Sequence, residues 1–208
     1  MTGATTRRPR AKRGEGDRLR AEILAAAERL LIQTGDEGAV SVRAIADAAG
    51  VTPPSIYLHF ADKTELLAAV CEARFADFDR YLEEAAGAFD DPLQALWARG
   101  RAYVRFGLEN PEHYRLLFMT RPGSDGPPVA LDRLPGLVAF GHLVEEVARC
   151  MDAGALAAGD PFLTATGLWS AVHGVTSLLI ARPDFPWPDL DTLMAHVVGV
   201  QERGLASS

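Results

Sequence analysis

The strongest constraint on the fold is the stretch from Ser41 to Lys63, SVRAIADAAGVTPPSIYLHFADK. Its first half carries an apolar stripe at helical spacing, made by Val42, Ile45, Ala46 and Ala49. This spacing predicts a short helix that has Ser41 as its N-cap and ends at Gly50. Two short helices joined by a glycine-containing turn are typical of a helix-turn-helix motif, whose second helix enters the major groove of DNA.

The second short helix is predicted directly after this turn. Thr52 offers an N-cap, and Pro53 takes the first helical position, where its missing N–H costs nothing. Ile56 and Phe60, four residues apart, give the helix its buried face. Hydroxyl, imidazole and cationic groups on the opposite face can bind phosphates or base edges. The predicted DNA contacts are Ser41, Arg43, Thr52, Pro53, Pro54, Ser55, Tyr57, His59 and Lys63.

The run A-I-A-D-A-A-G-V-T-P-P-S-I-Y-L-H-F-A-D-K resembles the DNA-binding signature of the TetR family of transcriptional regulators. The resemblance implies an all-α chain of about nine helices, in which a three-helix helix-turn-helix head precedes a helical effector-binding and dimerisation domain. A second run, L-W-S-A-V-H-G, together with N-P-E-H-Y-R-L-L-F, resembles a C-terminal subtype of that family. The recurring Trp, His and Gly of this subtype match Trp169, His173 and Gly174.

The resemblance also implies a mode of action. In the family the last two long helices pair with their copies in a second subunit, which predicts a homodimer. A dimer is also expected on physical grounds, because one recognition helix spans few bases, whereas two heads about 34–36 Å apart read a palindrome across one turn of DNA. We therefore expect a regulator, most simply a repressor that binds a palindromic operator and is released by a small-molecule effector.

The charge of the chain is distributed unevenly, although its net value of −7 argues at first against a nucleic-acid partner. Residues 1–63 carry a balance of +2, and residues 64–208 carry −9. This polarity fits one DNA-facing end and an acidic body. Residues 1–16 are rich in Gly, Pro and Arg and lack periodicity, which predicts a disordered basic arm. Such an arm either adds DNA contacts or serves only as a solubilising tail.

Helical patterns cover the rest of the chain and predict a DNA-binding domain over 17–70 and an effector-binding and dimerisation domain over 71–208. A first helix from Asp17 to Gly35 is expected to cover the apolar side of the helix-turn-helix pair. A helix from Lys63 to about Ala86 is expected to connect the two domains. The remaining predicted helices are Pro92–Glu109, Glu112–Thr120, Leu137–Met151 and two longer ones that close the chain, with a Pro- and Gly-rich loop over Arg121–Gly136.

The second domain contains large aromatic and imidazole side chains that could line an effector site. The candidates are Trp97, Tyr103, Phe106, His113, Phe118, Trp169 and His173. Such residues can form an apolar wall with a few polar groups that orient a small apolar or aromatic molecule. The same residues at helical spacing fit a hydrophobic core, which is the more frequent arrangement. A regulator whose second domain binds another protein is an open alternative.

A small helical enzyme is the remaining alternative, and the sequence gives it little support. The motifs G-x-S-x-G and H-E-x-x-H are absent, so we expect no catalytic residues and no cofactor. The histidines and cysteines are too scattered to suggest a metal site, and Cys71 and Cys150 are expected to be reduced and buried. No apolar run approaches the ~20 residues of a membrane span and no secretion leader is visible, which predicts a cytoplasmic protein.

Overall fold

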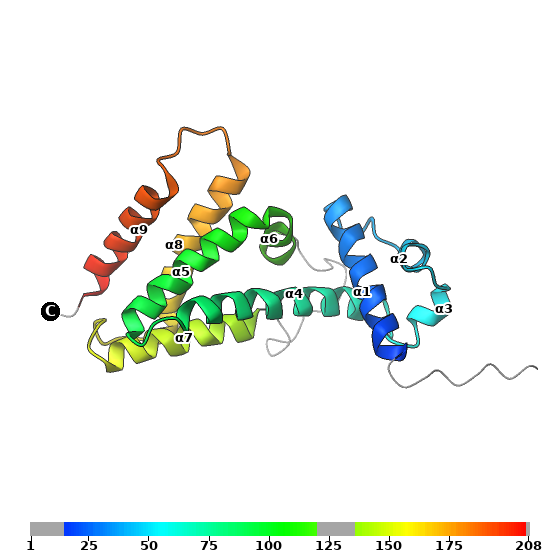
Figure 1. The fold of residues 1–208 in the computed structure, drawn as a ribbon, viewed down its shortest axis with the longest axis horizontal. Helices are drawn as coiled ribbons and strands as arrows, with labels where there is room; N and C mark the ends of the chain where they lie inside the picture. Colours follow the sequence, from blue (N-terminus) through cyan, green and yellow to red (C-terminus); the bar gives the residue numbers. More distant parts are fainter. Residues whose placement is uncertain (1–14, 120–135, 207–208) are drawn as a thin grey trace, which may run out of the picture. The chain divides into compact units, whose positions relative to one another are not determined.

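A computed structural model of the protein describes residues 15–119 and 136–206. These residues form helices and contain no strand, so the predicted all-α fold is confirmed (Figure 1). Residues 1–14 of the predicted basic arm and most of the predicted Pro- and Gly-rich loop lie outside the described residues, whereas Glu15 and Gly16, predicted as the end of the disordered arm, belong to the first helix. The helices are α1 (Glu15–Thr34), α2 (Val42–Ala49), α3 (Pro53–Ile56), α4 (Lys63–Ala86), α5 (Pro92–Glu109), α6 (Pro111–Phe118), α7 (Leu137–Asp152), α8 (Pro161–Ala181) and α9 (Leu190–Leu205).

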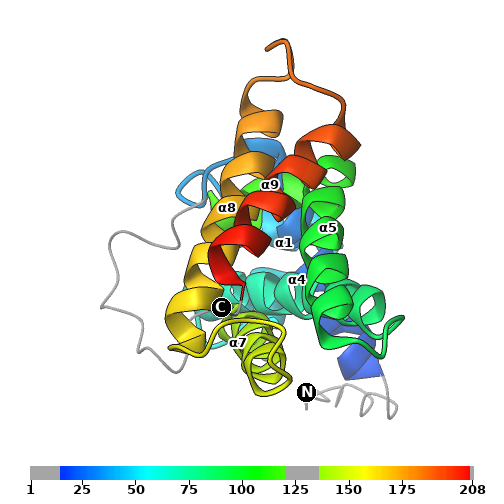
Figure 2. The ribbon, with the colours of Figure 1, turned by 90° about the vertical axis from the view of Figure 1, so that its left-hand side faces the viewer.

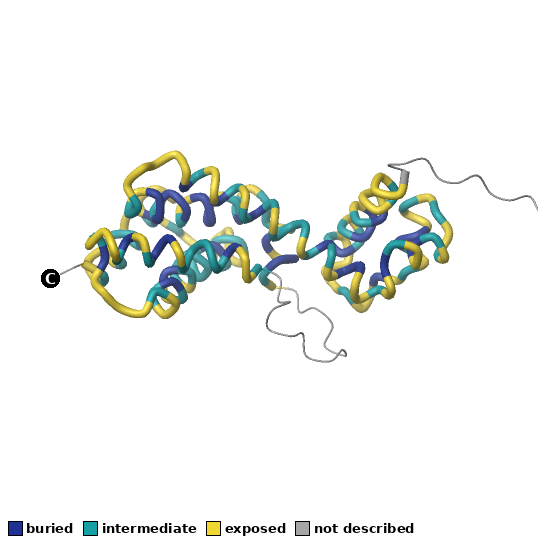
Figure 3. The backbone as a smooth tube through the Cα atoms, turned by 90° about the horizontal axis from the view of Figure 1, so that it is seen from below, coloured by how far each residue is buried: buried dark blue, intermediate teal, exposed yellow. Residues whose placement is uncertain are grey.

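The chain divides into two compact units, the first ending at Val70 and the second beginning at Cys71. The division falls inside α4, so one continuous helix belongs to both units. Each unit has its own buried residues on the inner faces of its helices (Figure 3). The assignment of these units to DNA binding and effector binding stays a prediction.

The core of the first unit forms where α1 covers α2 and α3. Helix α1 contributes buried residues at helical spacing, namely Ile23, Ala26, Ala27 and Leu31. Ile45 of α2 and Ile56 of α3 are also buried, as is Phe60 after α3. The apolar stripe predicted for the first helix therefore does cover the helix-turn-helix pair. Arg20 of α1 adds a cation–π contact, with its guanidinium 5.0 Å from the centre of the Phe60 ring.

The second unit is built around α5, which packs against both α7 and α8. Gly107 allows α5 and α8 to approach closely, because a Cβ atom at this position would lie 2.2 Å from Thr176 Cγ2. One buried cluster gathers around Tyr103 and Tyr114, and a second around Leu96 and Val147. Cys150 is buried in the second cluster as predicted, whereas Cys71 is half-buried, so the prediction of burial is wrong for Cys71; the two cysteines do not form a disulfide.

Helices α8 and α9 leave much of their surface uncovered. Figures 1 and 2 show α9 returning from the loop that follows α8, and Met194 is the buried residue of α9. Large apolar side chains are exposed on both helices, among them Phe162, Leu163, Leu178 and Val200. Helix α8 has 21 residues and a mean hydropathy of 1.3, enough by length and composition to cross a membrane, with 22% of that stretch buried. The sequence-based statement that no apolar run approaches a membrane span is therefore wrong for α8.

Candidate DNA-binding surface and effector cavity

Helix α2 begins and ends as its sequence predicts. Ser41 has extended backbone angles, and its Oγ accepts a hydrogen bond from the Ala44 N–H at 3.1 Å. Gly50 adopts a left-handed conformation with φ +67°, and its N–H bonds carbonyls of the last turn. The turn holds Ile45 and Ala46 inward and leaves Arg43 exposed near the start of the helix.

Helix α3 is shorter than predicted, because regular helix covers Pro53–Ile56 and a turn continues through His59. Thr52 occupies the N-cap position, but its hydroxyl contacts Ser55 Oγ at 3.0 Å and makes no hydrogen bond to the backbone. Tyr57 and Leu58 are exposed by 53% and 82%. The other predicted contacts, Thr52, Pro53, Pro54, Ser55 and His59, are exposed or half-buried, so none of this row is buried in its own subunit.

The start of α4 is capped by two side chains, those of Asp62 and Glu65. Asp62 Oδ1 accepts from the Glu65 N–H at 2.8 Å, and Glu65 reaches back to the Ala61 N–H. Lys63, a predicted phosphate contact, is half-buried, and its Nζ donates to the Glu37 carbonyl at 2.7 Å. An ammonium has three donors, so this bond leaves capacity for a phosphate.

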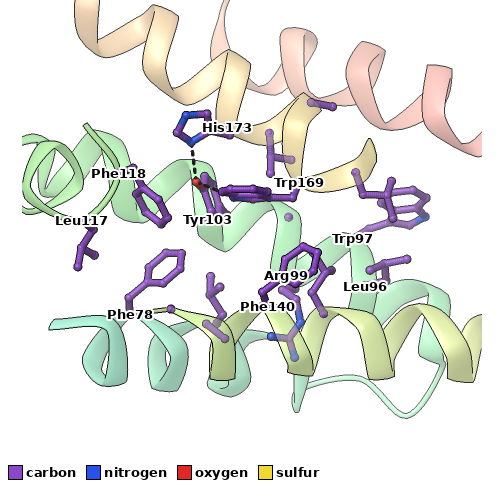
Figure 4. A pocket seen from close by; sticks show the side chains of 18 of the residues that line it. Phe78, Leu96, Trp97, Arg99, Tyr103, Leu117, Phe118, Phe140, Trp169 and His173 are labelled. Carbon is purple, nitrogen blue, oxygen red and sulfur yellow. Dashed lines mark hydrogen bonds between the residues drawn. The ribbon is translucent and has the colours of Figure 1, made fainter. Parts of the chain in front are cut away.

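The second unit contains a cavity of about 470 Å³, walled by residues of α4 to α9. Its volume lies within the range of small-molecule sites. Five of the seven predicted effector contacts line it: Trp97, Tyr103, Phe118, Trp169 and His173 (Figure 4). Phe75 and Phe78 bring α4 into the same wall, and Val197 and Gln201 bring α9.

Two predicted effector contacts do not line this cavity. Phe106 packs instead into the aromatic core, with ring centres 5.0 Å from Phe78 and 5.7 Å from Tyr81. His113 is half-buried on α6 and is absent from the cavity wall, whereas its neighbour Tyr114 is buried in the core. Helical spacing predicted that these residues face inward but could not separate the cavity from the packed core beside it.

A polar cluster forms one part of the cavity wall. Tyr103 Oη lies 3.0 Å from His173 Nδ1 and accepts a hydrogen bond from Trp169 Nε1 at 3.2 Å. Tyr114 Oη lies 2.7 Å from the same His173 nitrogen and 3.3 Å from Tyr103 Oη. The Tyr114 hydroxyl was not predicted to take part. The sequence did contain a signal, because Tyr114 lies four residues before Phe118 and therefore on the same face of a helix.

The groups of this cluster are neutral at physiological pH. Burial lowers the pKa of His173, and it raises the pKa of Tyr114 to about 12 and that of Tyr103 further. A neutral imidazole has one N–H donor and one nitrogen acceptor. The cluster therefore offers dipoles and no net charge to a molecule in the cavity.

Arg99 is the charged residue in the cavity wall, and sequence reasoning missed it. The residue is 3% exposed; its Nη2 bonds Glu83 and lies 3.8 Å from Glu146 Oε2. Glu146 is itself buried and bonds Arg149. The signal was present in the sequence, because Arg99 is three residues after Leu96 and four before Tyr103, both on the buried face of α5.

Asp79, Glu83 and His142 place their ligand atoms within 4.8 Å of one another. The sequence-based prediction of no metal site did not anticipate this convergence, since the residues lie on α4 and α7. His142 Nδ1 lies 3.0 Å from Asp79 Oδ1, and this hydrogen bond raises the pKa of His142. Because Arg99 already bonds Glu83, we interpret the group as an ion-pair cluster that joins α4, α5 and α7.

Comparison with known protein families accounts for both units. Residues 23–70 match the family described as "Bacterial regulatory proteins, tetR family", and residues 96–200 match "Tetracyclin repressor-like, C-terminal domain". The chain belongs to the TetR family. It is thus a transcription regulator of the TetR family rather than an enzyme, as the sequence predicted.

Individual relatives of this TetR-family chain agree with that assignment. The HTH-type transcriptional regulator EthR of Mycolicibacterium smegmatis is 32% identical over 111 residues, which cover 52% of this chain and 48% of EthR. The transcriptional activator FasR of the same organism is 32% identical over 117 residues, covering 54% of this chain and 53% of FasR. The chain thus spans about half the length of these relatives.

Solved structures share the fold over nearly the whole chain. A protein of unknown function from Rhodococcus sp. RHA1 has a TM-score of 0.78 at 27% identity and covers 97% of this chain and 100% of its own. FadR from Bacillus subtilis, solved in complex with stearoyl-CoA, has a TM-score of 0.72 at 17% identity and covers 89% of this chain and 98% of its own. The second likeness concerns the fold alone.

Proposed function

We propose that this TetR-family regulator is a ligand-responsive repressor that binds a palindromic operator as a homodimer and leaves it when an effector fills the cavity of the second unit. The observation that carries the proposal is the composition of the cavity wall. Phe75, Phe78 and Leu82 of α4 line the cavity, and α4 begins at Lys63, next to the predicted DNA-binding residues.

This continuity gives a physical basis for regulation. A molecule in the cavity contacts the helix that also supplies Lys63, so two positions of α4 would differ both in ligand contacts and in DNA contacts. A ligand that prefers one position lowers DNA affinity by its differential affinity for the two. A coupling of about 1–3 kcal/mol, or roughly 5–150-fold in affinity, is the ordinary range.

DNA recognition is proposed to use the exposed row around α3 together with Arg43 and Lys63. Arg43 and Tyr57 are exposed and polar, and Leu58 can pack on a thymine methyl group. The two adjacent prolines, Pro53 and Pro54, supply no N–H donors, so side chains rather than backbone groups would meet the DNA at the start of α3.

The homodimer is proposed to form through α8 and α9. Exposed apolar residues on both helices, among them Leu178 and Val200, support an interface that a second copy would cover. A second copy would also account for the low burial of the apolar helix α8. The resemblance to the Trp-His-Gly subtype agrees with this role for the last two helices, and we propose that the chain belongs to it through Trp169, His173 and Gly174.

A small-molecule effector is favoured over a protein partner for the second unit. The cavity lies among six helices, and most of its lining is apolar with a few polar groups, as expected for a small ligand. FadR of Bacillus subtilis was solved with stearoyl-CoA, whose acyl chain is long and apolar, and this supports an effector with an apolar chain as a starting point. Activation is the alternative to repression, because the relative FasR is a transcriptional activator.

The proposal is tested by selecting bound fragments from a random pool of duplex DNA with the purified full chain. The expected product is an inverted repeat whose retention falls with salt. The selected site is then bound with and without apolar ligands, which should lower the affinity by at least about fivefold for a true effector. Selection of a single half-site, or retention of all duplexes alike, would contradict the proposed palindromic recognition.

A further inference from the structure

Three side chains on α4 and α7 bring metal-ligating atoms together away from the effector cavity. Asp79 and Glu83 are four residues apart and therefore lie on one face of α4. Helix α7 runs beside this part of α4 and supplies His142 (Figures 1 and 2). One ligand atom of each residue lies within 4.8 Å of the other two. None of these three described residues lines the cavity.

The separations of these atoms are close to those around a bound metal ion. His142 Nδ1 lies 3.0 Å from Asp79 Oδ1 and 3.6 Å from Glu83 Oε1. Zinc binds nitrogen and oxygen ligands at about 2.0–2.2 Å, so neighbouring ligands of a tetrahedral ion lie about 3.3–3.6 Å apart. Small rotations of the three side chains are therefore enough to place their ligand atoms around one ion.

The three residues are also open enough for an ion to enter. The side chain of His142 is 37% exposed and that of Glu83 is 44% exposed, whereas that of Asp79 is 14% exposed. Three protein ligands leave a position of a tetrahedral ion to water. The half-exposed surface supplies this water directly from solvent.

The charges in contact with one another favour a cation. They belong to the carboxylates of Asp79, Glu83 and Glu146 and to the guanidinium groups of Arg99 and Arg149. Three negative charges thus face two positive ones, and the cluster has one negative charge in excess when His142 is neutral. A cation is attracted to such a cluster and an anion is repelled.

The ion pair between Arg99 and Glu83 is compatible with a metal. Arg99 donates to Glu83 Oε1, and an ionised carboxylate offers about four lone-pair sites on its two oxygens. Carboxylates that bind metals are themselves hydrogen-bonded by neighbouring groups that fix their orientation. Arg99 is buried and Glu83 is exposed, so the arginine holds this carboxylate from the protein side while its other lone pairs face solvent.

We propose that Asp79, Glu83 and His142 form a binding site for a divalent transition-metal ion such as zinc. An imidazole nitrogen together with carboxylates suits such an ion, whereas magnesium and calcium prefer sets made only of oxygen ligands. The ion takes the place of the hydrogen bond between His142 and Asp79 and joins α4 to α7. Without the ion the same residues form the ion-pair cluster described above.

The test is isothermal titration calorimetry of the untagged full chain with zinc chloride. The titration is made at about pH 8, because an imidazole must be neutral to bind a metal. One zinc ion per chain should bind, at least about tenfold more tightly than magnesium or calcium. Zinc should also raise the temperature of thermal unfolding, since it binds the folded chain in preference to the unfolded one.

Matched variants assign the site. His142→Gln and Asp79→Asn each remove one ligand at nearly constant size. The loss of an outer partner of a metal ligand already costs about 10–100-fold in affinity, so each variant should weaken zinc binding at least about tenfold. His196→Gln is the control and should keep the affinity, because His196 is exposed on α9.

Circular dichroism checks that the variants fold. Glu83→Gln replaces either ligand variant that does not fold, and the titrations of the unaltered protein stand in any case. Loss of zinc binding in the ligand variants but not in His196→Gln would support the site. Binding that survives the ligand variants, or that His196→Gln removes as well, would place zinc elsewhere and overturn the inference.

Two further outcomes would contradict the proposal. Equal affinity for zinc and magnesium would overturn the transition-metal class. Absence of zinc binding at about millimolar concentration would leave the three residues as an ion-pair cluster only. The proposed function is independent of both outcomes, because the DNA selection and the ligand titration test the operator and the cavity separately.

Discussion

Tyr114 Oη and His173 Nδ1 lie 2.7 Å apart, although 59 residues separate them in the sequence. The hydrogen bond joins α6 to α8 behind the cavity wall, and Tyr114 is fully buried. Because burial lowers the pKa of His173 and raises that of Tyr114, both groups are neutral at neutral pH, and the hydrogen bond joins a hydroxyl to an uncharged imidazole. The bond therefore fixes the orientation of the imidazole that lines the cavity.

Replacing Tyr114 by Phe should destabilise the protein by about 0.5–1.5 kcal/mol, the net worth of a buried hydrogen bond. The loss is kept to this range because Tyr103 Oη remains within 3.0 Å of the same nitrogen. Denaturant unfolding monitored by circular dichroism measures the change. Tyr57→Phe is the control. Because Tyr57 is 53% exposed, this substitution should change the unfolding free energy very little. Equal effects of the two variants would contradict the role of the buried bond.

Gly107→Ala should destabilise the second unit, because the new methyl group would lie 2.2 Å from Thr176 Cγ2. Overpacking of this kind typically costs about 1–3 kcal/mol. The matched control is Gly141→Ala on α7, where no atom lies within 4 Å of the added carbon. That variant should stabilise its helix by roughly 0.5–1 kcal/mol. Thermal unfolding should therefore shift in opposite directions for the two variants, and a shift in the same direction would show that α5 can move away from α8.

The helix boundaries were predictable where local signals set them. Asp91 and Pro92 start α5, and Asn110 before Pro111 ends it, at the positions that the sequence indicated. The length of α3 was not predictable in this way, because Ile56 and Phe60 are both buried whether the chain between them is helix or turn. Local spacing fixes which residues face inward but leaves open the conformation that achieves it.

The cavity could be predicted in part. Aromatic side chains at helical spacing pointed to Tyr103 and Trp169, but the same rule included Phe106, which packs in the core. Whether inward residues meet in a core or enclose a space depends on how α5, α7 and α8 approach one another, a long-range property. Arg99 was not predicted, because the spacing of aromatic residues does not indicate a buried charge on the same face of the helix.

The His142–Asp79 pair should make stability depend on pH. The hydrogen bond to Asp79 raises the pKa of His142 above its ordinary value of 6.5. The folded protein thus binds the proton more tightly, so the stabilisation is complete below pH 6.5 and is lost as pH rises through the raised pKa. His142 is 37% exposed, which limits the effect to about 0.2–1 kcal/mol. The measurement is the difference in unfolding free energy between the protein and its His142→Gln variant at pH 6 and pH 8.5. A difference that grows with pH would contradict the assignment.

Lys63→Gln should weaken binding to the selected operator and to unrelated duplexes alike. One phosphate contact contributes a slope of about 0.9 in the dependence of log affinity on log salt concentration, and the variant should lose this amount. Arg101→Gln is the control and should keep the slope, because Arg101 is exposed on α5 in the second unit. An unchanged slope for Lys63→Gln would contradict the phosphate contact and leave Lys63 with a structural role only, through its hydrogen bond to the Glu37 carbonyl.

Arg43→Ala should act differently from the lysine variant. A bidentate arginine contact to guanine discriminates against other bases by about 1–3 kcal/mol. Loss of the exposed Arg43 side chain should therefore relax the base preference at one base pair of each half-site. The affinity for unrelated DNA sequences should change little. Repeating the selection with the variant measures this preference directly. Equal weakening on all sequences would make Arg43 a backbone contact.

Placing a charge on the uncovered face of α8 should dissociate the proposed dimer. Leu178 is 50% exposed and Val200 of α9 is 47% exposed, so Leu178→Asp and Val200→Asp each introduce an acid without disturbing the core of the subunit. Burying that acid in an interface between copies is costly, and sedimentation at micromolar concentration should report a monomer. Phe89→Asp is the matched control, because Phe89 is 40% exposed and lies between α4 and α5, outside the two helices proposed to form the interface. A dimer that survives both substitutions on α8 and α9, or that is lost equally in the Phe89 variant, would require a different pair of surfaces.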